Sequence, residues 1–101
     1  MERYIVLLNF TEAGIQNVAH WQEMLARARA CLKRSKGRLE VYLTMGPYDA
    51  VAIALAPNDE TMAAALLHLG GFGQVRTICL KAFDEKQHAK ILKIMGTFPD
   101  R

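Results

Sequence analysis

Two neighbouring residues, Tyr48 and Asp49, carry the side chains in this sequence best suited to acid-base chemistry. They follow a Gly46-Pro47 pair that predicts a tight turn, and a phenol beside a carboxylate can bind a polar small molecule or exchange protons with it. A turn aspartate also commonly accepts from backbone N–H groups, and a tyrosine ring can pack against its own turn. We favour this structural role and keep ligand binding as the alternative.

A second candidate group gathers around Arg76, which lies at the start of a predicted strand. If that strand lies beside the first strand, Asn9, Arg76 and the turn converge at one end of the sheet. The planar guanidinium of arginine is well suited to hold an anionic group. An ion pair from Arg76 to Asp49 or to Glu40 explains the residue equally well, so both interpretations stay open.

The histidines do not form a metal-binding pattern. His20 and Glu23 stand three residues apart on a predicted helix and superficially resemble one arm of a metal site. His68 and His88 lie on other predicted helices and have no carboxylate at that spacing, so we predict no metal and no cofactor. His20 stays a candidate ligand-binding residue, whereas Trp21 falls on an apolar stripe and is expected in the core.

No nucleophile motif is present. Cys31 is predicted inside a helix near basic residues and Cys79 inside a strand, where most cysteines act as small core hydrophobes. The chain has no G-x-S-x-G, P-loop or G-x-G-x-x-G motif, and Gly70-Gly71-Phe72-Gly73 is better explained as a helix stop. The sequence therefore assigns no catalytic residue and leaves open whether the protein is an enzyme.

Composition limits the class of protein. The 101 residues fit a single domain, residues 1–101, and the 51% apolar and 23% charged residues are typical of globular chains. No apolar stretch approaches the ~20 residues that a membrane helix needs. The two cysteines suggest neither a disulfide framework nor a zinc site, so we expect a cytoplasmic protein that does not bind membranes.

The first half of the chain predicts a strand followed by a helix. Residues 4–10 are apolar on both faces, which is typical of a central strand. Residues 11–14 predict a turn, and Asn17 can cap a long amphipathic helix that ends near Gly37, with the glycine in the left-handed conformation. Its apolar stripe comprises Val18, Trp21, Leu25, Ala28 and Leu32.

The second half predicts a hairpin, a helix, a strand and a last helix. Residues 38–45 and 48–55 alternate in polarity or size around the Gly46-Pro47 turn. Asn58 or Asp59 can cap the next helix, which ends at Gly70-Gly71, and a fourth strand spans about residues 75–83. Asp84 and Gln87 then resemble a capping box at the start of a C-terminal helix.

This β-α-β-β-α-β order predicts a ferredoxin-like α+β fold in which a four-stranded antiparallel sheet carries two helices on one face. The opposite face is unusually apolar for a surface in water, because the first strand is apolar on both sides and we place Ala50, Ala52 and Ala54 on this face. A second copy of the sheet would cover it in an isologous dimer. A loop or the C-terminal helix folding over the face is the alternative.

The sequence argues against nucleic acid as a partner. RNA-recognition modules of this topology stack bases on exposed aromatic residues of their central strands, and residues 50–54 contain none. Residues 27–38 carry six cations and no acid, so weak nonspecific polyanion binding remains an alternative. A solvated helix face is the more common role of such a run.

Several segments, taken in order, resemble the GYD-domain family across nearly the whole chain. They are residues 4–11, Gly14-Ile15, residues 42–49, residues 56–61 and Val75-Arg76-Thr77 with Leu80 and Phe83. The Gly-x-Tyr-Asp turn that gives the family its name stands here as Gly46-Pro47-Tyr48-Asp49. The resemblance implies a ferredoxin-like domain similar to the dimeric α/β-barrel proteins, in a family whose biochemical role is unassigned.

Three functions follow from these observations. The first is a homo-oligomeric protein that binds a small molecule between sheet and helices, with Tyr48, Asp49, Arg76, Asn9 and His20 as candidate ligand-binding residues. The second is a noncatalytic assembly or regulatory module. The third is a nonspecific polyanion binder.

Overall fold

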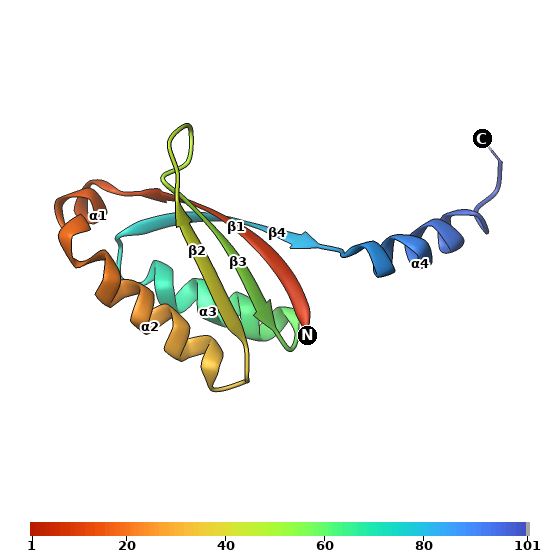
Figure 1. The fold of residues 1–101 in the computed structure, drawn as a ribbon, viewed down its shortest axis with the longest axis horizontal. Coiled ribbons are helices and arrows are strands. Elements are labelled where there is room, and N and C mark those ends of the chain that lie inside the picture. Colours follow the sequence, from red (N-terminus) through yellow and green to blue (C-terminus); the bar gives the residue numbers. More distant parts are fainter. Residues whose placement is uncertain (101) are drawn as a thin grey trace.

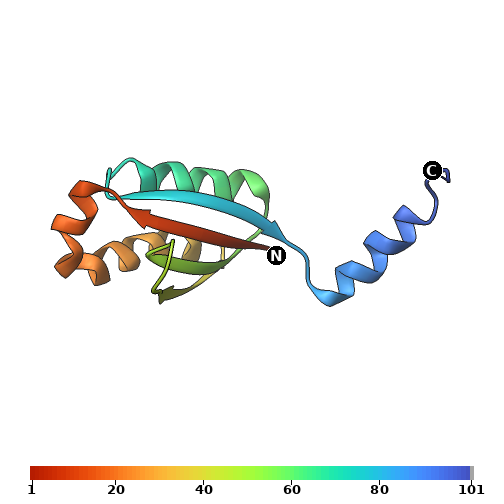
Figure 2. The ribbon, with the colours of Figure 1, turned by 90° about the horizontal axis from the view of Figure 1, so that it is seen from above.

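The computed structural model describes residues 1–100, whose four strands form one antiparallel sheet in the order β2-β3-β1-β4. Helices α2 and α3 cover one face of this sheet (Figure 1), and α4 extends beyond its end (Figure 2). The predicted ferredoxin-like α+β order with a C-terminal helix is therefore confirmed. The elements are β1 (Glu2–Phe10), α1 (Glu12–Gln16), the 3-10 helix η1 (Val18–His20), α2 (Trp21–Lys33), β2 (Arg38–Leu43), β3 (Ala50–Ala56), α3 (Asp59–Gly70), β4 (Val75–Ala82) and α4 (Glu85–Met95).

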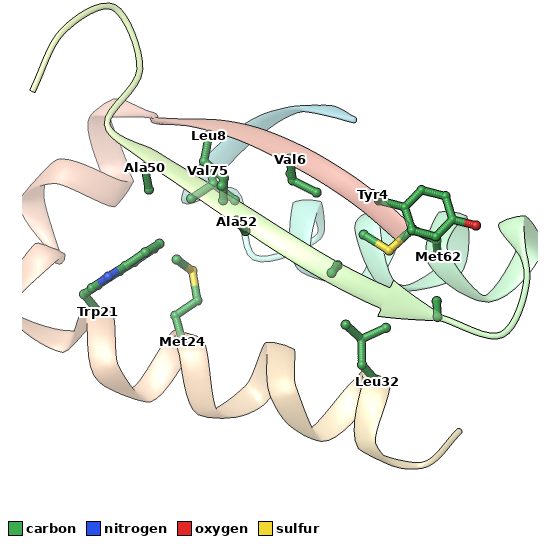
Figure 3. Packing of buried hydrophobic residues seen from close by; sticks show 12 residues of the cluster. Tyr4, Val6, Leu8, Trp21, Met24, Leu32, Ala50, Ala52, Met62 and Val75 are labelled. Atoms are coloured by element: carbon green, nitrogen blue, oxygen red, sulfur yellow. The ribbon is translucent and has the colours of Figure 1, made fainter. Parts of the chain in front are cut away.

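The core lies between the sheet and these two helices. Alternate residues of β1 point toward the helices, where they meet Trp21 and Met24 of α2 and Met62 of α3 (Figure 3). The Trp21 ring packs edge-on against Phe10, with ring centroids 5.1 Å apart. The buried hydrophobic residues are Tyr4, Val6, Leu8, Trp21, Met24, Leu32, Ala50, Ala52, Ala54, Ala56, Met62 and Val75.

The alanines of β3 lie on the face opposite to the one that we predicted. Ala50, Ala52 and Ala54 are buried under the helices, and the larger Val51, Ile53 and Leu55 face outward. The prediction was wrong because both sets are apolar, so hydrophobicity alone does not choose between the faces. Side-chain volume decides which face is buried, because the large side chains from α2 and α3 need small residues beneath them to pack at normal density.

The connection from β1 to α2 also differs from the prediction. Residues 11–14 form no simple turn, because Thr11 caps the short helix α1 and its Oγ1 accepts from the Gly14 N–H. A Cβ at Gly14 would lie 1.9 Å from the Gln74 carbonyl oxygen, so glycine lets α1 approach the start of β4. Asn17 makes no side-chain cap, and the 3-10 helix η1 follows it, so the long helix α2 begins only at Trp21.

The end of α2 corrects a second expectation. The helix ends at Lys33, and the left-handed residue is Lys36 (φ 64°), not Gly37. Gly37 is required for a different reason: a Cβ there would lie 2.4 Å from the carbonyl oxygen of Leu55. The Gly37 N–H donates to the carbonyl of Leu32 (2.8 Å), and this bond terminates the helix just before β2.

The remaining boundaries follow the sequence closely. β2 ends at Leu43 and β3 begins at Ala50, so the connecting loop around Gly46 (φ 136°) is longer than predicted and projects from the sheet (Figure 1). Asn58 caps α3 through its bond from the Thr61 N–H (2.9 Å). The predicted capping box of α4 is present. No helix within residues 1–100 is both long and apolar enough to cross a membrane.

Candidate functional site

The sheet face that carries no helix, here called the open face, presents a continuous apolar band. The strand register aligns its side chains in two rows across β3, β1 and β4, because directly paired residues share a face. Ile78 is 51% exposed and Leu80 46% exposed, and the other members are half-buried. The rows are Ile53-Ile5-Leu80 and Val51-Leu7-Ile78, with Leu55 beside them.

Polar side chains border this apolar band along β2 and at one end. The register places Arg38, Glu40 and Tyr42 of β2 along one margin of the open face, where the Tyr42 hydroxyl donates to Glu40. Asn9 and Arg76 lie at one end of the face. An apolar centre with a polar rim is the anatomy of a protein-protein interface, whereas isolated surface hydrophobes would need no explanation. The predicted apolar face is therefore present, although different residues form it.

Asp49 fastens the β2-β3 loop to the end of β1. One of its carboxylate oxygens, Oδ2, accepts from the Phe10 N–H (2.8 Å). Its own N–H donates to the Leu8 carbonyl (2.9 Å) and points toward Asn9 Oδ1 (3.2 Å). The carboxylate therefore bonds to backbone, as in the structural role that we favoured, but its partner lies on β1 and not in the turn itself.

Tyr48 and His20 lie apart from this network. Tyr48 is half-buried in the loop, and its carbonyl accepts from the Thr44 hydroxyl (2.6 Å). His20 is at the exposed start of α2, where its Nδ1 lies 3.6 Å from Glu23 Oε1. Within residues 1–100, no group of three His, Cys, Asp or Glu side chains is placed to hold a metal ion.

Arg76 and Asn9 face each other across β4 and β1, as the topology predicted, and line one groove. The groove has a volume of about 580 Å³ and is also bordered by Thr11 and Glu12. Among residues 1–100, Arg76 forms an ion pair with neither Asp49 nor Glu40. The structure thus brings two of the five candidate ligand-binding residues to one groove, and Asp49 stands next to them through its bond to Asn9.

The space between sheet and helices is small. A cavity of about 50 Å³ lies there, lined by apolar side chains that include Trp21, Met24, Met62 and Leu66. Sites for small molecules usually measure about 300–1,000 Å³ and carry a few polar groups. The described residues therefore leave no ligand-sized space at the position where we first expected one.

Sequence reasoning missed one ionic cluster, formed by Tyr4, Asp59 and Lys81. The Tyr4 hydroxyl donates to Asp59 Oδ1 (2.5 Å), and Lys81 Nζ lies 2.6 Å from the same oxygen and 3.6 Å from Glu2. Burial and the Asp59 carboxylate raise the pKa of Tyr4, while the hydrogen bonds from Lys81 and Tyr4 lower the pKa of Asp59. At neutral pH these shifts keep Tyr4 protonated, Asp59 ionised and Lys81 charged. The cluster is therefore better suited to hold β1, α3 and β4 together than to exchange protons in catalysis.

The comparisons with known proteins agree with this architecture. A Thermus thermophilus protein named "Glutamine synthetase and cystathionine beta-lyase binding protein" is 34% identical over 84 residues, which cover 81% of this chain and 88% of that protein. The crystal structure of TTHA0845, also from Thermus thermophilus, has a similar fold, with a TM-score of 0.55 and 23% identity over 83% of this chain and 95% of that chain. Residues 4–92 match the model of the GYD domain, and the chain therefore belongs to the GYD-domain family.

Proposed function

We propose that this chain is a noncatalytic assembly module that pairs with a second copy through the open face and, as a homo-oligomer, binds a metabolic enzyme. The observation that carries the proposal is the apolar band of the open face with its polar rim. A broad apolar surface on a sheet fits another sheet, whereas small molecules usually bind in a concave cleft or cavity with a few polar groups. The second of the three functions predicted from the sequence thus gains support over the first.

A second copy is the natural occupant of this face. Two identical sheets stack about 10 Å apart and interdigitate their side chains, and a two-fold axis makes the contact self-complementary. Burying a Val, Leu or Ile side chain completely stabilises an assembly by roughly 1.5–3 kcal/mol relative to full exposure. Half-buried side chains such as Ile5 and Ile53 retain part of that gain for the dimer.

The enzyme partner is proposed from the Thermus relative, whose name states that it binds glutamine synthetase and cystathionine beta-lyase. Identity of 34% over most of both chains supports a related binding role here. Since self-association occupies the open face, the helix surfaces and the loops remain available for the enzyme.

Direct binding to these two enzymes tests the proposal. Purified glutamine synthetase and cystathionine beta-lyase from the organism that encodes this chain would be titrated against the immobilised full chain by biolayer interferometry. We expect at least one enzyme to bind with a dissociation constant of roughly micromolar or tighter, as protein interfaces of standard size do. An unrelated enzyme of similar size and charge serves as the control. If neither enzyme binds more strongly than this control, the enzyme-binding role is wrong.

A second candidate function is binding of a small anionic molecule in the groove of Arg76 and Asn9. The specific observation in its favour is that Arg76 forms no ion pair within residues 1–100 although it lines a groove of about 580 Å³. An arginine fork in such a position can hold a carboxylate or phosphate in a bidentate manner.

Native mass spectrometry of the purified protein checks this candidate. We expect a bound small-molecule mass on the wild-type chain that is lost in Arg76→Gln, because the amide keeps the polarity but removes the charged fork. Arg34→Gln, which removes an exposed arginine at the end of α2, is the matched control and should retain the mass. An identical spectrum for wild type and Arg76→Gln would exclude an Arg76-dependent ligand.

A further inference from the structure

Helix α4 stands away from the rest of the protein with its apolar side chains in water. It follows β4 after two residues and extends past the end of the sheet in both views (Figures 1 and 2). No other helix of the described chain packs extensively against it. Its exposed apolar side chains are Ile91 (41% exposed), Leu92 (57%), Ile94 (49%) and Met95 (55%), and they continue into Phe98 (64%).

The helix is strongly two-sided. At 100° per residue, Ile91, Leu92 and Met95 fall on one side and the cations Lys86, Lys90 and Lys93 on the opposite one, while Ile94 lies between the two, next to Lys90. A helix that only extended into solvent would not need this segregation. The pattern is that of a helix whose apolar side packs on a surface.

The short length of α4 also indicates that the helix needs a surface to pack on. Isolated helices shorter than about 12–15 residues are marginal in water, and α4 spans 11 residues. Its capping box, formed by Asp84 and Gln87, adds roughly 1 kcal/mol at one end. The remaining stability has to come from packing of the apolar side.

The link to β4 keeps α4 away from its own sheet. Only Phe83 and Asp84 separate Ala82 from Glu85, and Asp84 is engaged as the N-cap of the helix. Asp84 also lies 3.9 Å from the Arg3 guanidinium of β1. In this arrangement Asp84 joins the start of α4 to β1, and the apolar side of the helix stays uncovered by the rest of its own chain within residues 1–100, so it is open to a second molecule.

We propose that α4 is an exchanged arm: in the homodimer, each copy lays the Ile91, Leu92 and Met95 side of α4 on the other copy. This inference rests on the proposed self-association and adds a second contact to it. The area requirement identifies the second copy as the occupant. A standard interface takes about 20–30 residues from each side. The strand register places only three or four residues of each strand on the open face, so the sheet alone falls short of that size. α4 adds apolar surface beyond the end of the sheet, where it continues from the edge strand β4.

The first test measures the dimer dissociation constant by sedimentation equilibrium on the full chain. The double variant Leu92→Glu with Met95→Glu should raise this constant at least tenfold, because it removes two apolar side chains from the contact and would bury two carboxylates there without partners. Lys90→Gln, on the cationic side of the same helix, is the matched control and should change it less than about twofold. A monomeric wild type would overturn the proposed self-association, whereas a dimer that the double variant leaves intact would overturn only the arm.

The second test locates the arm without any substitution. In an equimolar mixture of isotope-labelled and unlabelled full chain, isotope-filtered NOE spectra report only contacts between copies. We expect intermolecular signals from the methyl groups of Ile91, Leu92 and Met95. A dimeric sample that gives no intermolecular signals from these methyl groups would show that α4 does not pack on the second copy.

Discussion

Replacing Ile5 by glutamate is expected to convert a dimer of this chain into a folded monomer. Ile5 lies at the centre of the open face, directly between Ile53 on β3 and Leu80 on β4. In the single chain a carboxylate at this position faces water, but between two stacked sheets it would be buried without a partner. A loss of about 3 kcal/mol or more in association, which is at least a hundredfold in the dissociation constant, follows from values for central interface residues.

Sedimentation velocity at several concentrations measures this shift, and far-UV circular dichroism shows whether the monomer is folded. Ile5→Val keeps the apolar character and should remain dimeric. Gln22→Glu introduces the same charge on the exposed side of α2 and should also leave the dimer intact. If Ile5→Glu stays dimeric while the wild type is dimeric, the open face is not the interface.

Replacing Trp21 by alanine is expected to produce the largest loss of stability among single core substitutions. The ring is 8% exposed and packs at 88° against Phe10, over the small alanines of β3. Its removal enlarges the apolar cavity that it already borders. Tryptophan to alanine in a core typically costs about 3–5 kcal/mol, a large fraction of the roughly 5–15 kcal/mol of a typical domain.

Urea unfolding followed by circular dichroism tests this prediction, and the monomeric Ile5→Glu background removes the concentration dependence that a dimer would add. Trp21→Phe keeps an aromatic ring against Phe10 and should lose clearly less stability than the alanine variant. Gln22→Ala, the exposed neighbour in sequence, should change the free energy of unfolding by less than about 0.5 kcal/mol. A Trp21→Ala loss below about 1 kcal/mol would mean that the helix layer does not depend on this ring.

The order of strands and helices could be predicted from the sequence because each element has its own period and its own start signal. Asn58, Asp84 and Gln87 marked two helix starts correctly, since capping depends on neighbours in the chain. We placed the left-handed residue after α2 at Gly37, whereas it is Lys36. The glycine is needed because the Leu55 carbonyl approaches it closely, and that tertiary contact cannot be read from the sequence. Capping signals could be predicted from the sequence, whereas contacts between elements distant in the chain could not.

The candidate site shows the same division. The pairing of Asn9 with Arg76 followed from topology alone, whereas the bond from the Phe10 N–H to Asp49 joins residues far apart in the chain and could not be read from turn chemistry. The orientation of β3 could not be predicted, because a strand with valine, isoleucine and leucine on one side and alanine on the other is apolar on both sides. The cluster of Tyr4, Asp59 and Lys81 was missed since no sequence spacing links three residues from different elements.

The central position of β1 has a consequence for the synthesis of the protein. β1 is made first, yet its two neighbours in the sheet are β3 and β4, and the pairing with β4 joins residues as far apart as Arg3 and Ala82. A nascent chain therefore cannot complete its sheet until the residues of β4 have left the ribosome, and pairings this distant in sequence form slowly. During that interval the apolar side chains of β1 are exposed on both faces, so we expect this protein to depend on chaperones more than a helical bundle of equal length.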